Sequence, residues 1–410
     1  MIVTPSLYAG IDVGSTKNAL CCLGASGQRL DKGKLCANNL PGAQAIEAQL
    51  AQLCQTHYPQ HLIVGTEATS FYDFHVLEFL AASEKLAPFS PVLYRINPKL
   101  IKHFKKGYPE GHNTDETAAF FIADFLRFGR LPHPFNAKME YLPLQRLTRF
   151  RAHVSRQITV EKNYFLSHLF LKFSAYQQVR PFSDTFGATS QAVIAEFFSV
   201  DDIAQLSMED LVRFICEKGK NRFPHPEQVV EKIKQVARES YRIRPALAES
   251  VSLVLAMSWQ NIRALEQTLK EMDKAIENAF AAFPNTLQSV PGLGPVYSAG
   301  IFAEIGDINR FAGDAQLAKL AGLAWKRNQS GKFEAQETHL MNAANTHLRY
   351  YLIEAANSLK NHNPEYRAYY QKKYQEVRQH QHKRALALTA RKLVRLVYAL
   401  LKKQQLYQSH

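Results

Sequence analysis

Strand-like and helix-like patterns alternate from residue 6 to residue 135, and this alternation limits the fold more than any other feature. The strand-like runs are short and apolar, namely Leu7–Val13, Asn18–Leu23, His61–Thr66 and Pro91–Ile96. The helix-like segments are Pro41–Leu53, Phe71–Ala82, Pro98–Lys106 and Thr114–Phe128, the last with Thr114 as its expected N-cap. Strands that alternate with helices favour a layered α/β domain. We expect this domain at residues 1–140.

From Leu142 onward the pattern is helical, so the whole chain is predicted as α/β plus all-α. We expect a helical middle region at 141–283, with an irregular insertion at about 181–235, and a helical C-terminal domain at 284–410. Apolar residues at three- and four-residue steps from Leu247 to Ile276 fit a coiled-coil seam. Trp259 and Asn261 make the heptads imperfect, so a helix packed within its own domain is the alternative.

The chain is strongly basic. Fifty Lys and Arg against 36 Asp and Glu give a net charge of +14 and a pI near 9.4. Such a charge favours a polyanionic partner, although a generally basic surface is the simpler reading. The five cysteines form no C-x-x-C pair, which is typical of reduced thiols in a cytoplasmic protein. We find neither a signal peptide nor an apolar run long enough for a membrane span.

Three acidic residues stand where carboxylates are costly. Asp12 interrupts the apolar run Ala9–Gly14, Glu67 ends the run that begins at Leu62, and Asp115 opens a helix. Acids at the ends of core strands are unfavourable unless they are paired or hold a cation. Separate turn or capping roles would explain each acid alone. Together they predict a site for Mg²⁺ or Mn²⁺ that acts on nucleic acid.

The motifs around these acids resemble a known family. Gly10–Ser15 resembles the opening of RuvC-like, RNase H-like nucleases, and Glu67–Tyr72 resembles the second acidic motif of the DEDD transposases of bacterial insertion sequences. Asn113–Ala119 resembles the family's Lys-Thr-Asp-x-x-Asp-Ala segment. The chain departs from the pattern at Ser70, where the family has glycine, and at Asn113, where it has lysine.

A third departure concerns chemistry, because Ala118 stands where the family has its fourth carboxylate. Positions 115 and 118 share one helical face, so both would reach the same metal ions. Glu116 lies about 100° around the helix from Asp115, and Asp124 about 180°, so neither is expected to replace the missing acid. The resemblance therefore implies a metal site of Asp12, Glu67 and Asp115 that is weakened at Ala118.

The C-terminal part carries the same resemblance. Ser289–Gly294 resembles the family's Ile-Pro-Gly-Ile-Gly segment, in which Gly292 and Gly294 would turn backbone amides toward DNA phosphates, although a plain tight turn fits equally well. By the resemblance, Ser330 is the nucleophile that becomes joined to DNA. Lys326, Arg327 and Lys332 give it a cationic setting. Asn345–Arg349 and Ala390–Leu393 also resemble family signatures.

The resemblance implies an RNA-guided DNA transposase or recombinase. Its partners would be donor and target DNA and a structured guide, the bridge RNA. It would form a homodimer, and a tetramer on DNA, in the bacterial cytoplasm near the nucleoid and away from membranes. Further basic residues expected to bind nucleic acid are Lys99, Lys102, Lys105, Lys106, Arg146, Arg149, Arg151, Arg156, Arg349, Arg391 and Lys392. A solvated helix face is the alternative for the arginines.

Other classes of protein compete with this reading. A Holliday-junction nuclease would need the acids but not Ser330. A nucleic-acid-binding variant with weakened catalysis would follow from Ala118. Gly10–Thr16 also resembles the first phosphate loop of actin-like ATPases and sugar kinases. That fold would need a second Asp-Gly-Gly loop downstream, and none follows in the sequence. This last reading also leaves the basic helical C-terminus unexplained.

Overall fold

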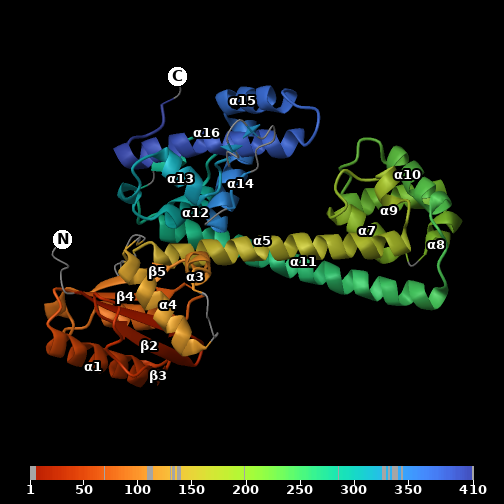
Figure 1. Ribbon diagram of the computed structural model, residues 1–410. Helices are drawn as coiled ribbons and strands as arrows, with labels where there is room; N and C mark the ends of the chain where they lie inside the picture. The colour runs from red at the N-terminus through yellow and green to blue at the C-terminus, as the bar shows by residue number, and fades with distance from the viewer. Residues whose placement is uncertain are drawn as a thin grey trace. The chain divides into compact units, whose positions relative to one another are not determined.

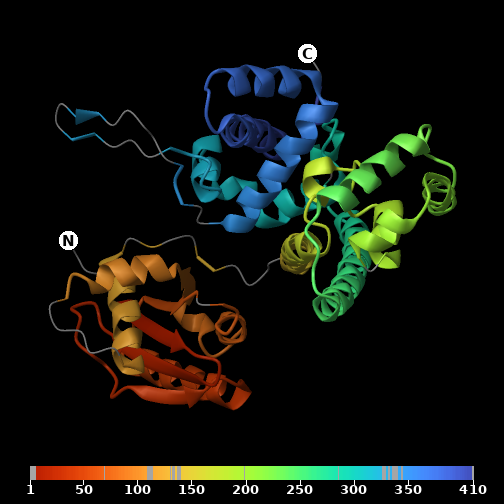
Figure 2. The same cartoon turned by 90° about the vertical axis from the view of Figure 1, so that its right-hand side faces the viewer.

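The structure is a computed structural model that divides the chain into two compact units (Figures 1 and 2). We call Met1–Glu140 the N-terminal unit and Tyr141–His410 the C-terminal unit. The described residues are 6–68, 70–108, 114–129, 131, 134–135, 140–197, 199–284, 286–325, 329–330, 333–334, 340–342 and 345–408. Within the C-terminal unit the structure sets no boundary near residue 283, where the sequence analysis places one.

A mixed five-stranded sheet forms the centre of the N-terminal unit. Its strands are β1 (Ser6–Val13), β2 (Lys17–Leu23), β3 (Lys34–Ala37), β4 (His61–Glu67) and β5 (Val92–Ile96), in the order β3-β2-β1-β4-β5. β2 runs antiparallel to β1 and β3, while β4 is parallel to β1 and β5. The four predicted strands are confirmed. The sequence analysis missed β3, which has only four residues and buries only Cys36.

Helices cover both faces of this sheet. α1 (Leu40–His57), α2 (Phe74–Ala81) and the short η1 (Ala87–Phe89) belong to one face, where Ile11, Val13 and Leu62 enter a common core. α3 (Pro98–Lys105) and α4 (Asp115–Phe128) belong to the other. The predicted helices are confirmed, and Thr114 caps α4 by accepting a hydrogen bond from the Thr117 amide. Because β1 side chains alternate between faces, Gly10 and Asp12 point toward α4 while Ile11 and Val13 point away.

The C-terminal unit contains two long antiparallel helices that lie side by side, α5 (Leu142–Lys172) and α11 (Pro245–Phe280) (Figure 1). Ion pairs of 2.7 Å join them, Arg151 to Asp273 and Lys162 to Glu266. The apolar seam of α11 packs against α5 of the same chain, since Val251, Leu255 and Ile262 share a core with Phe165 and Leu169. The helix thus packs within its own unit, and pairing between copies stays a prediction.

Two helical clusters complete the C-terminal unit. The insertion is helical, as predicted, with α6 (Tyr176–Val179), α7 (Ala188–Glu196), α8 (Val200–Gln205), α9 (Met208–Gly219) and α10 (Pro226–Glu239). The other cluster contains η2 (Thr286–Ser289), α12 (Pro295–Ile305), η3 (Ile308–Arg310), α13 (Asp314–Leu320), β6 (Gln329–Ser330), β7 (Phe333–Glu334), α14 (Thr346–His362), α15 (Pro364–Gln375) and α16 (Gln381–Lys403). Each cluster has its own apolar core.

Two expectations of the sequence analysis concern the whole chain. In the part of the chain that the structure describes, no helix has the length and apolarity to cross a membrane. All five cysteines are free thiols, and four of them are buried. Burial raises the pKa of the Cys21 and Cys54 thiols to about 11, so both are protonated and unreactive at neutral pH.

Candidate active site

Small residues bring α4 unusually close to β1. A Cβ at Gly10 would overlap the Ala119 carbonyl oxygen and the Ala123 amide nitrogen, so only glycine permits this approach. Ala119 and Ala123 are themselves fully buried against the sheet. Asp12 follows Gly10 by two residues, and Asp115 precedes Ala119 by one helical turn. The close packing therefore brings the acid of β1 to the beginning of α4.

Asp12 interacts electrostatically with each of the other two predicted acids. Burial raises the pKa of the Asp12 carboxyl, and the neighbouring Asp115 carboxylate raises it further, while Lys105 opposes the rise. Burial likewise raises the pKa of the Glu67 carboxyl, which Lys105 lowers and the Asp12 carboxylate raises. The charges of Asp115 and Lys105 thus act on Asp12, and those of Lys105 and Asp12 act on Glu67. The sequence analysis assigned Lys105 to nucleic acid and missed this position, because no local pattern links α3 to the acids.

Neighbouring acids do not replace the carboxylate missing at Ala118. Glu116 acts on Arg29 and Cys21, away from the three acids. Asp124 is buried, forms a 2.6 Å ion pair with Arg127 and accepts a hydrogen bond from Tyr108. This outcome agrees with the helical geometry expected from the sequence.

The acids suit a hard divalent cation chemically, because carboxylate oxygens are the ligands of Mg²⁺ and Mn²⁺. Their geometry is incomplete. Among the described residues, no three His, Cys, Asp or Glu side chains lie close enough together to hold a metal ion. The carboxyl groups of Asp12, Glu67 and Asp115 are thus neighbours without forming a closed ligand set, and the methyl group of Ala118 offers no oxygen.

A polar network fixes the loop that follows Glu67. Thr66 Oγ1 donates to Asp73 Oδ2 at 3.1 Å, and Arg95 donates to both Asp73 oxygens at 2.5 and 2.7 Å. Arg95 also donates to the Ser70 carbonyl at 3.0 Å. Ser70 has φ +107°, a conformation that favours glycine, which is the residue that the resembled family has at this position. The loop is therefore held in one strained conformation by buried partners.

Asn38 connects this loop to the one that follows Asp12. Its Nδ2 donates to the Gly14 carbonyl at 2.8 Å and to the Tyr72 carbonyl at 3.2 Å. Gly14 lies just beyond the end of β1, and Tyr72 lies in the loop beyond β4. Asn38, which comes directly after β3, thereby ties together the loops at the carboxyl ends of both acid-bearing strands. The sequence analysis had no signal for this residue because it did not recognise β3.

Several basic residues expected to bind nucleic acid have protein partners instead. Arg149 forms a bidentate pair with the buried Glu304, at 2.7 and 2.8 Å, and Arg151 pairs with Asp273. Arg391 pairs with Asp314 at 2.8 Å, and Lys392 pairs with Glu365 at 2.7 Å. Each of these four side chains thus has an ion-pair partner within the protein. Their expected contact with nucleic acid stays a prediction.

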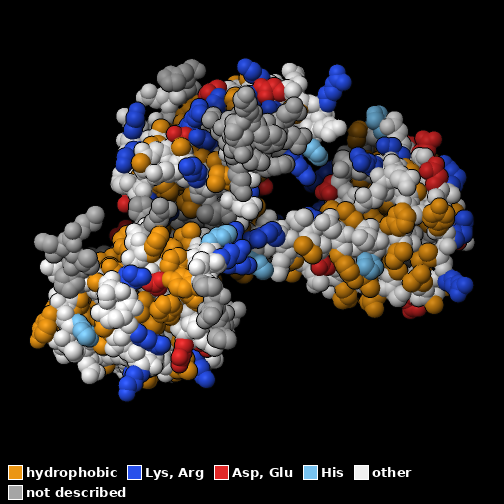
Figure 3. Space-filling model, viewed as in Figure 1, with side chains coloured by type: hydrophobic (Ala, Val, Ile, Leu, Met, Phe, Trp, Pro, Cys, Tyr) orange, Lys and Arg blue, Asp and Glu red, His pale blue; other side chains and the backbone are white. Residues whose placement is uncertain are grey.

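Other basic residues lie on the surface. Lys99, Lys102 and Lys106 are exposed on or beside α3, as is Arg156 on α5, whereas Arg146 is half-buried. Lys and Arg side chains are distributed over both units on the face seen in Figure 3. An electrostatic role for them needs no single patch, since phosphate contacts add along a nucleic acid.

The segment that carries Ser330 is anchored at both ends. In the antiparallel β6–β7 hairpin, Gln329 pairs with Glu334 and Ser330 pairs with Phe333. An isolated β-bridge joins Trp325, which precedes the hairpin, to Leu340, which follows it. Lys326, Arg327 and Lys332 lie outside the described residues.

Arg349 of α14 contacts the chain on both sides of the β6–β7 hairpin. Its guanidinium donates to the carbonyls of Ala321 and Gly322 before the hairpin and of Met341 after it. Such contacts fix the base of the hairpin, so the structure gives Arg349 a structural place where the sequence analysis expected nucleic acid.

A buried network adjoins the same anchor. Glu304 of α12 accepts hydrogen bonds from Asn345 at 2.7 Å and from Gln145 at 3.3 Å, besides those from Arg149. Asn345 also caps α14, donating its backbone amide to the Leu320 carbonyl and accepting from the Leu348 amide. The family-like segment Asn345–Arg349 therefore joins α5, α12 and α14 at the end of the Ser330 segment.

Gly292 and Gly294 differ in their surroundings. Gly292 has φ +94°, and a Cβ there would meet His362, so both backbone and space require glycine. Gly294 is the residue before α12, and a Cβ there would meet nothing within 4 Å. The predicted tight turn between helices is confirmed, and its contact with phosphates stays a prediction.

Two segments of the chain match transposase families. Residues 9–173 match the DEDD transposase family of IS110, and residues 285–371 match the family described as Transposase IS116/IS110/IS902. Two separate segments of this protein are therefore similar to transposase domains of the IS110/IS116/IS902 insertion-sequence group.

Individual relatives agree with these matches. The chain is 27% identical over 206 residues to the IS116 uncharacterized 44.8 kDa protein of Streptomyces clavuligerus, covering 50% of this chain and 51% of that protein. It is 31% identical over 165 residues to the IS110 43.6 kDa protein of Streptomyces coelicolor, covering 40% of this chain and 38% of that one. A third relative, the IS1111A transposase of Coxiella burnetii, is 32% identical over 97 residues, which cover 24% of this chain and 25% of that transposase. The chain spans about half the length, or less, of the curated relatives it matches.

Among solved structures, the chain is similar to Thermus thermophilus RuvC, with 15% identity and a TM-score of 0.25, over 32% of this chain and 99% of RuvC. RuvC in complex with a Holliday junction substrate gives a TM-score of 0.24.

Proposed function

We propose that this protein is an insertion-sequence transposase or recombinase that cuts and rejoins DNA strands, with an RNase H-like N-terminal domain. The observation that carries the proposal is that Asp12 of β1 interacts electrostatically with Asp115 of α4 and with Glu67 of β4, in the region that matches the DEDD transposases. Burial and a neighbouring acid raise the pKa of both Asp12 and Glu67, and carboxyl groups perturbed in this way are common at functional sites.

The acids would hold Mg²⁺ or Mn²⁺, weakly, because Ala118 adds no ligand. When bound, the ion would supply charge to stabilise the attacking and leaving oxygens. Lys105 would partly neutralise the acids and so reduce their repulsion of a DNA phosphate. Ser330 would be the nucleophile. Its oxygen–phosphorus bond would form as the bond between phosphorus and a deoxyribose oxygen breaks, with the serine proton passing to the departing oxygen. The bond count is conserved, so reversal of the step rejoins DNA.

Guidance by a bridge RNA and assembly into dimers and tetramers complete the proposal. The basic charge and the exposed α3 lysines support a nucleic-acid partner. Partly exposed Leu265 and Leu269 on α11 leave apolar surface for a second copy beside the contact with α5. RNA that co-purifies with the protein and is then sequenced would test guidance, and light scattering of charged variants at these two leucines would test assembly.

The decisive experiment restores the missing acid. We expect Ala118→Asp to raise cleavage of DNA that carries the element's ends by about 10- to 100-fold, as completion of a metal site does. A covalent protein–DNA product should appear on denaturing gels, and Ser330→Ala in the same background should abolish it. Unchanged cleavage in Ala118→Asp, together with loss of cleavage in Asp12→Ala, would show that position 118 is not the fourth ligand.

The second candidate is a Holliday-junction nuclease that uses the acids alone, and the grouping of the acids favours it equally. Under that candidate, cleavage persists in the Ser330→Ala variant of the Ala118→Asp protein and no covalent product forms. A third outcome, DNA binding without cleavage in Ala118→Asp, would indicate a binding protein.

A further inference from the structure

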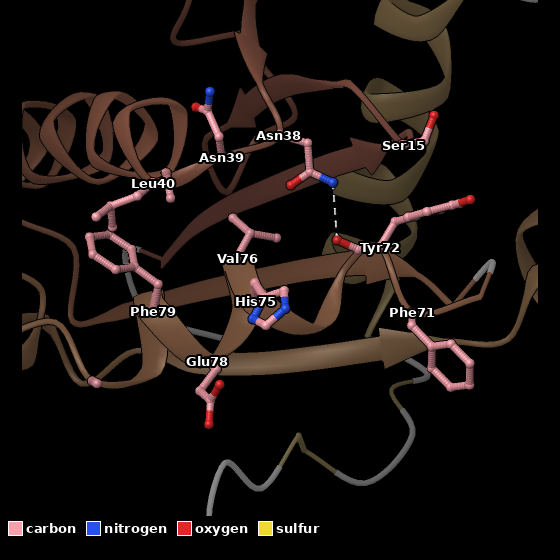
Figure 4. Close-up of a pocket in the computed structure, with 12 residues that line it drawn as sticks. Ser15, Asn38, Asn39, Leu40, Phe71, Tyr72, His75, Val76, Glu78 and Phe79 are labelled. Atoms are coloured by element: carbon pink, nitrogen blue, oxygen red, sulfur yellow. Dashed lines mark hydrogen bonds between the residues drawn. The ribbon is translucent and has the colours of Figure 1, made fainter. Parts of the chain in front are cut away.

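A cavity of about 710 Å³ lies in the N-terminal unit between α1, α2 and the loops after β1 and β4 (Figure 4). Leu40 and Phe79 stand at one side in this view, Phe71 and Tyr72 at the other, and His75 is drawn between them. Its volume falls within the range of small-molecule sites. Glu78 is the one acidic residue among the described residues that line the cavity, and no Lys or Arg is among them. The other lining residues are polar, aromatic or aliphatic, so the cavity suits an uncharged, flat, partly apolar group.

Two aromatic side chains at the rim of the cavity expose apolar surface to water, which is unfavourable. Phe71 is 50% and Tyr72 49% exposed, although neighbouring α2 residues such as Val76 and Leu77 are buried. The backbone that presents them is strained at Ser70 and is held by Arg95 and Asp73. Strain persists only where surrounding contacts impose it, and it gathers at ligand sites. The loop is thus built to hold two aromatic rings in water.

The cavity and the acids share one edge of the sheet. Ser15 lies in the loop after Asp12, and Phe71 and Tyr72 lie in the loop after Glu67. Asn38 binds both loops together through the carbonyls of Gly14 and Tyr72. Asp12 faces α4, whereas the cavity opens on the side of α1 and α2. A strand that crosses this edge would present a phosphate to the acids and an adjoining base to the cavity. Open α/β sheets bind ligands at this edge.

We propose that the cavity receives one unpaired nucleobase of the DNA strand whose phosphodiester lies at Asp12, Glu67 and Asp115. The proposal rests on the proposed DNA-cutting function and adds a base-binding site to it. Every base has a π-face that stacks on an aromatic ring, so Phe71 and Tyr72 would hold it without sequence preference. Ser15, Asn39 and His75 would offer hydrogen bonds to its edges. Enzymes that reach into a strand commonly hold a neighbouring base out of the stack.

Binding of a single-stranded oligothymidylate, measured in the full chain without metal, tests the proposal. Phe71→Ala and Tyr72→Ala should each weaken binding by about 5- to 150-fold, the range of one lost base stack. Tyr58→Ala is the matched control, because Tyr58 is 77% exposed in the same unit but precedes β4 at the opposite edge of the sheet. Tyr72→Phe keeps the ring and should bind as the unchanged protein does, which separates stacking from misfolding.

A cross-linking experiment then locates the base. Oligothymidylate that contains 5-iodouracil should cross-link on irradiation to residues between Phe71 and Phe79, as mapped by mass spectrometry. Wild-type affinity in both alanine variants, or cross-links that map only elsewhere, would overturn the proposal. Stronger competition by an RNA oligouridylate at these residues would assign the cavity to RNA and overturn the DNA assignment. Binding and cross-linking require no cleavage, so both results are independent of whether Ala118→Asp restores activity.

Discussion

Replacing Arg149 with Ala tests whether this arginine stabilises the C-terminal unit or binds a guide RNA. The guanidinium donates to both carboxylate oxygens of Glu304, a residue that is only 2% exposed. Removal of one partner from a buried ion pair costs about 3–5 kcal/mol, because the other charge stays buried without compensation. Glu304 keeps its hydrogen bonds from Asn345 and Gln145, so we expect the lower end, about 3 kcal/mol.

Tryptophan fluorescence provides the assay. The two tryptophans, Trp259 and Trp325, both lie in the C-terminal unit, so urea unfolding followed by their emission reports this unit alone. With a slope of about 3 kcal/mol per molar urea, the midpoint should fall by about 1 M. Arg156→Ala is the control. Arg156 is exposed and donates to Ala152 of its own helix, so its loss should change stability by less than about 0.5 kcal/mol.

Two results would refute this reasoning. The first is an Arg149→Ala protein with an unchanged urea midpoint and a weakened affinity for RNA, which would make the arginine a phosphate contact. The second concerns a double variant in which Met replaces both Arg149 and Glu304. Apolar replacement of a whole buried pair is commonly neutral or stabilising. A double variant less stable than Arg149→Ala would show that the pair's burial is not the source of the loss.

Three further predictions concern stability. Ser70→Gly should stabilise the N-terminal unit by about 1 kcal/mol in thermal unfolding, since relief of a strained φ outweighs the entropy that glycine adds; a lower melting temperature would contradict it. Gly10→Ala should destabilise that unit by about 1–3 kcal/mol through overlap with α4, whereas Gly294→Ala, which has open space, should cost much less. Burial lowers the pKa of Lys172 to about 8 from 10.5, so the unfolded chain holds the proton more tightly. Stability of the C-terminal unit should therefore rise by up to about 3 kcal/mol between pH 8 and 10.5, and Lys172→Met should remove the rise.

Four of the five strands and the α-helices of the N-terminal unit were predictable because each buries a local pattern, whereas the short β3 buries only Cys36. β1 and β4 are apolar runs, and α4 has both a capping threonine and a periodic apolar face. The interaction of Asp12 with Glu67 and with Asp115 was predictable for a related reason. Acids at the carboxyl ends of neighbouring parallel strands meet at one edge of the sheet, and helix α4 has to cover the sheet's open face.

The partners of the basic residues were not predictable, because charge along a sequence does not identify what lies opposite. Arg149 and Glu304 are 155 residues apart, and only the packing of α5 on α12 joins them. Periodicity on α11 likewise shows that a face is buried but not whether a neighbouring helix or a second copy buries it. The cavity escaped the sequence analysis because its lining comes from three separate segments of the chain, each unremarkable alone.

Ala118 and Ser70 depart from the resembled family at the same site, and their physical consequences differ. At position 70 the structure favours the family's glycine, so serine costs stability. At position 118 an aspartate would add a fourth negative charge beside Asp12 and Glu67, whose pKa values burial already raises. Without a cation this addition would be unfavourable, so we expect Ala118 to favour the metal-free fold. The Ala118→Asp protein should therefore melt below the parent chain without metal and gain more from Mg²⁺ than the parent does, because an ion that binds only the folded state adds stability in proportion to its affinity. Equal responses of the two proteins to Mg²⁺ in thermal unfolding would mean that position 118 does not face the ion.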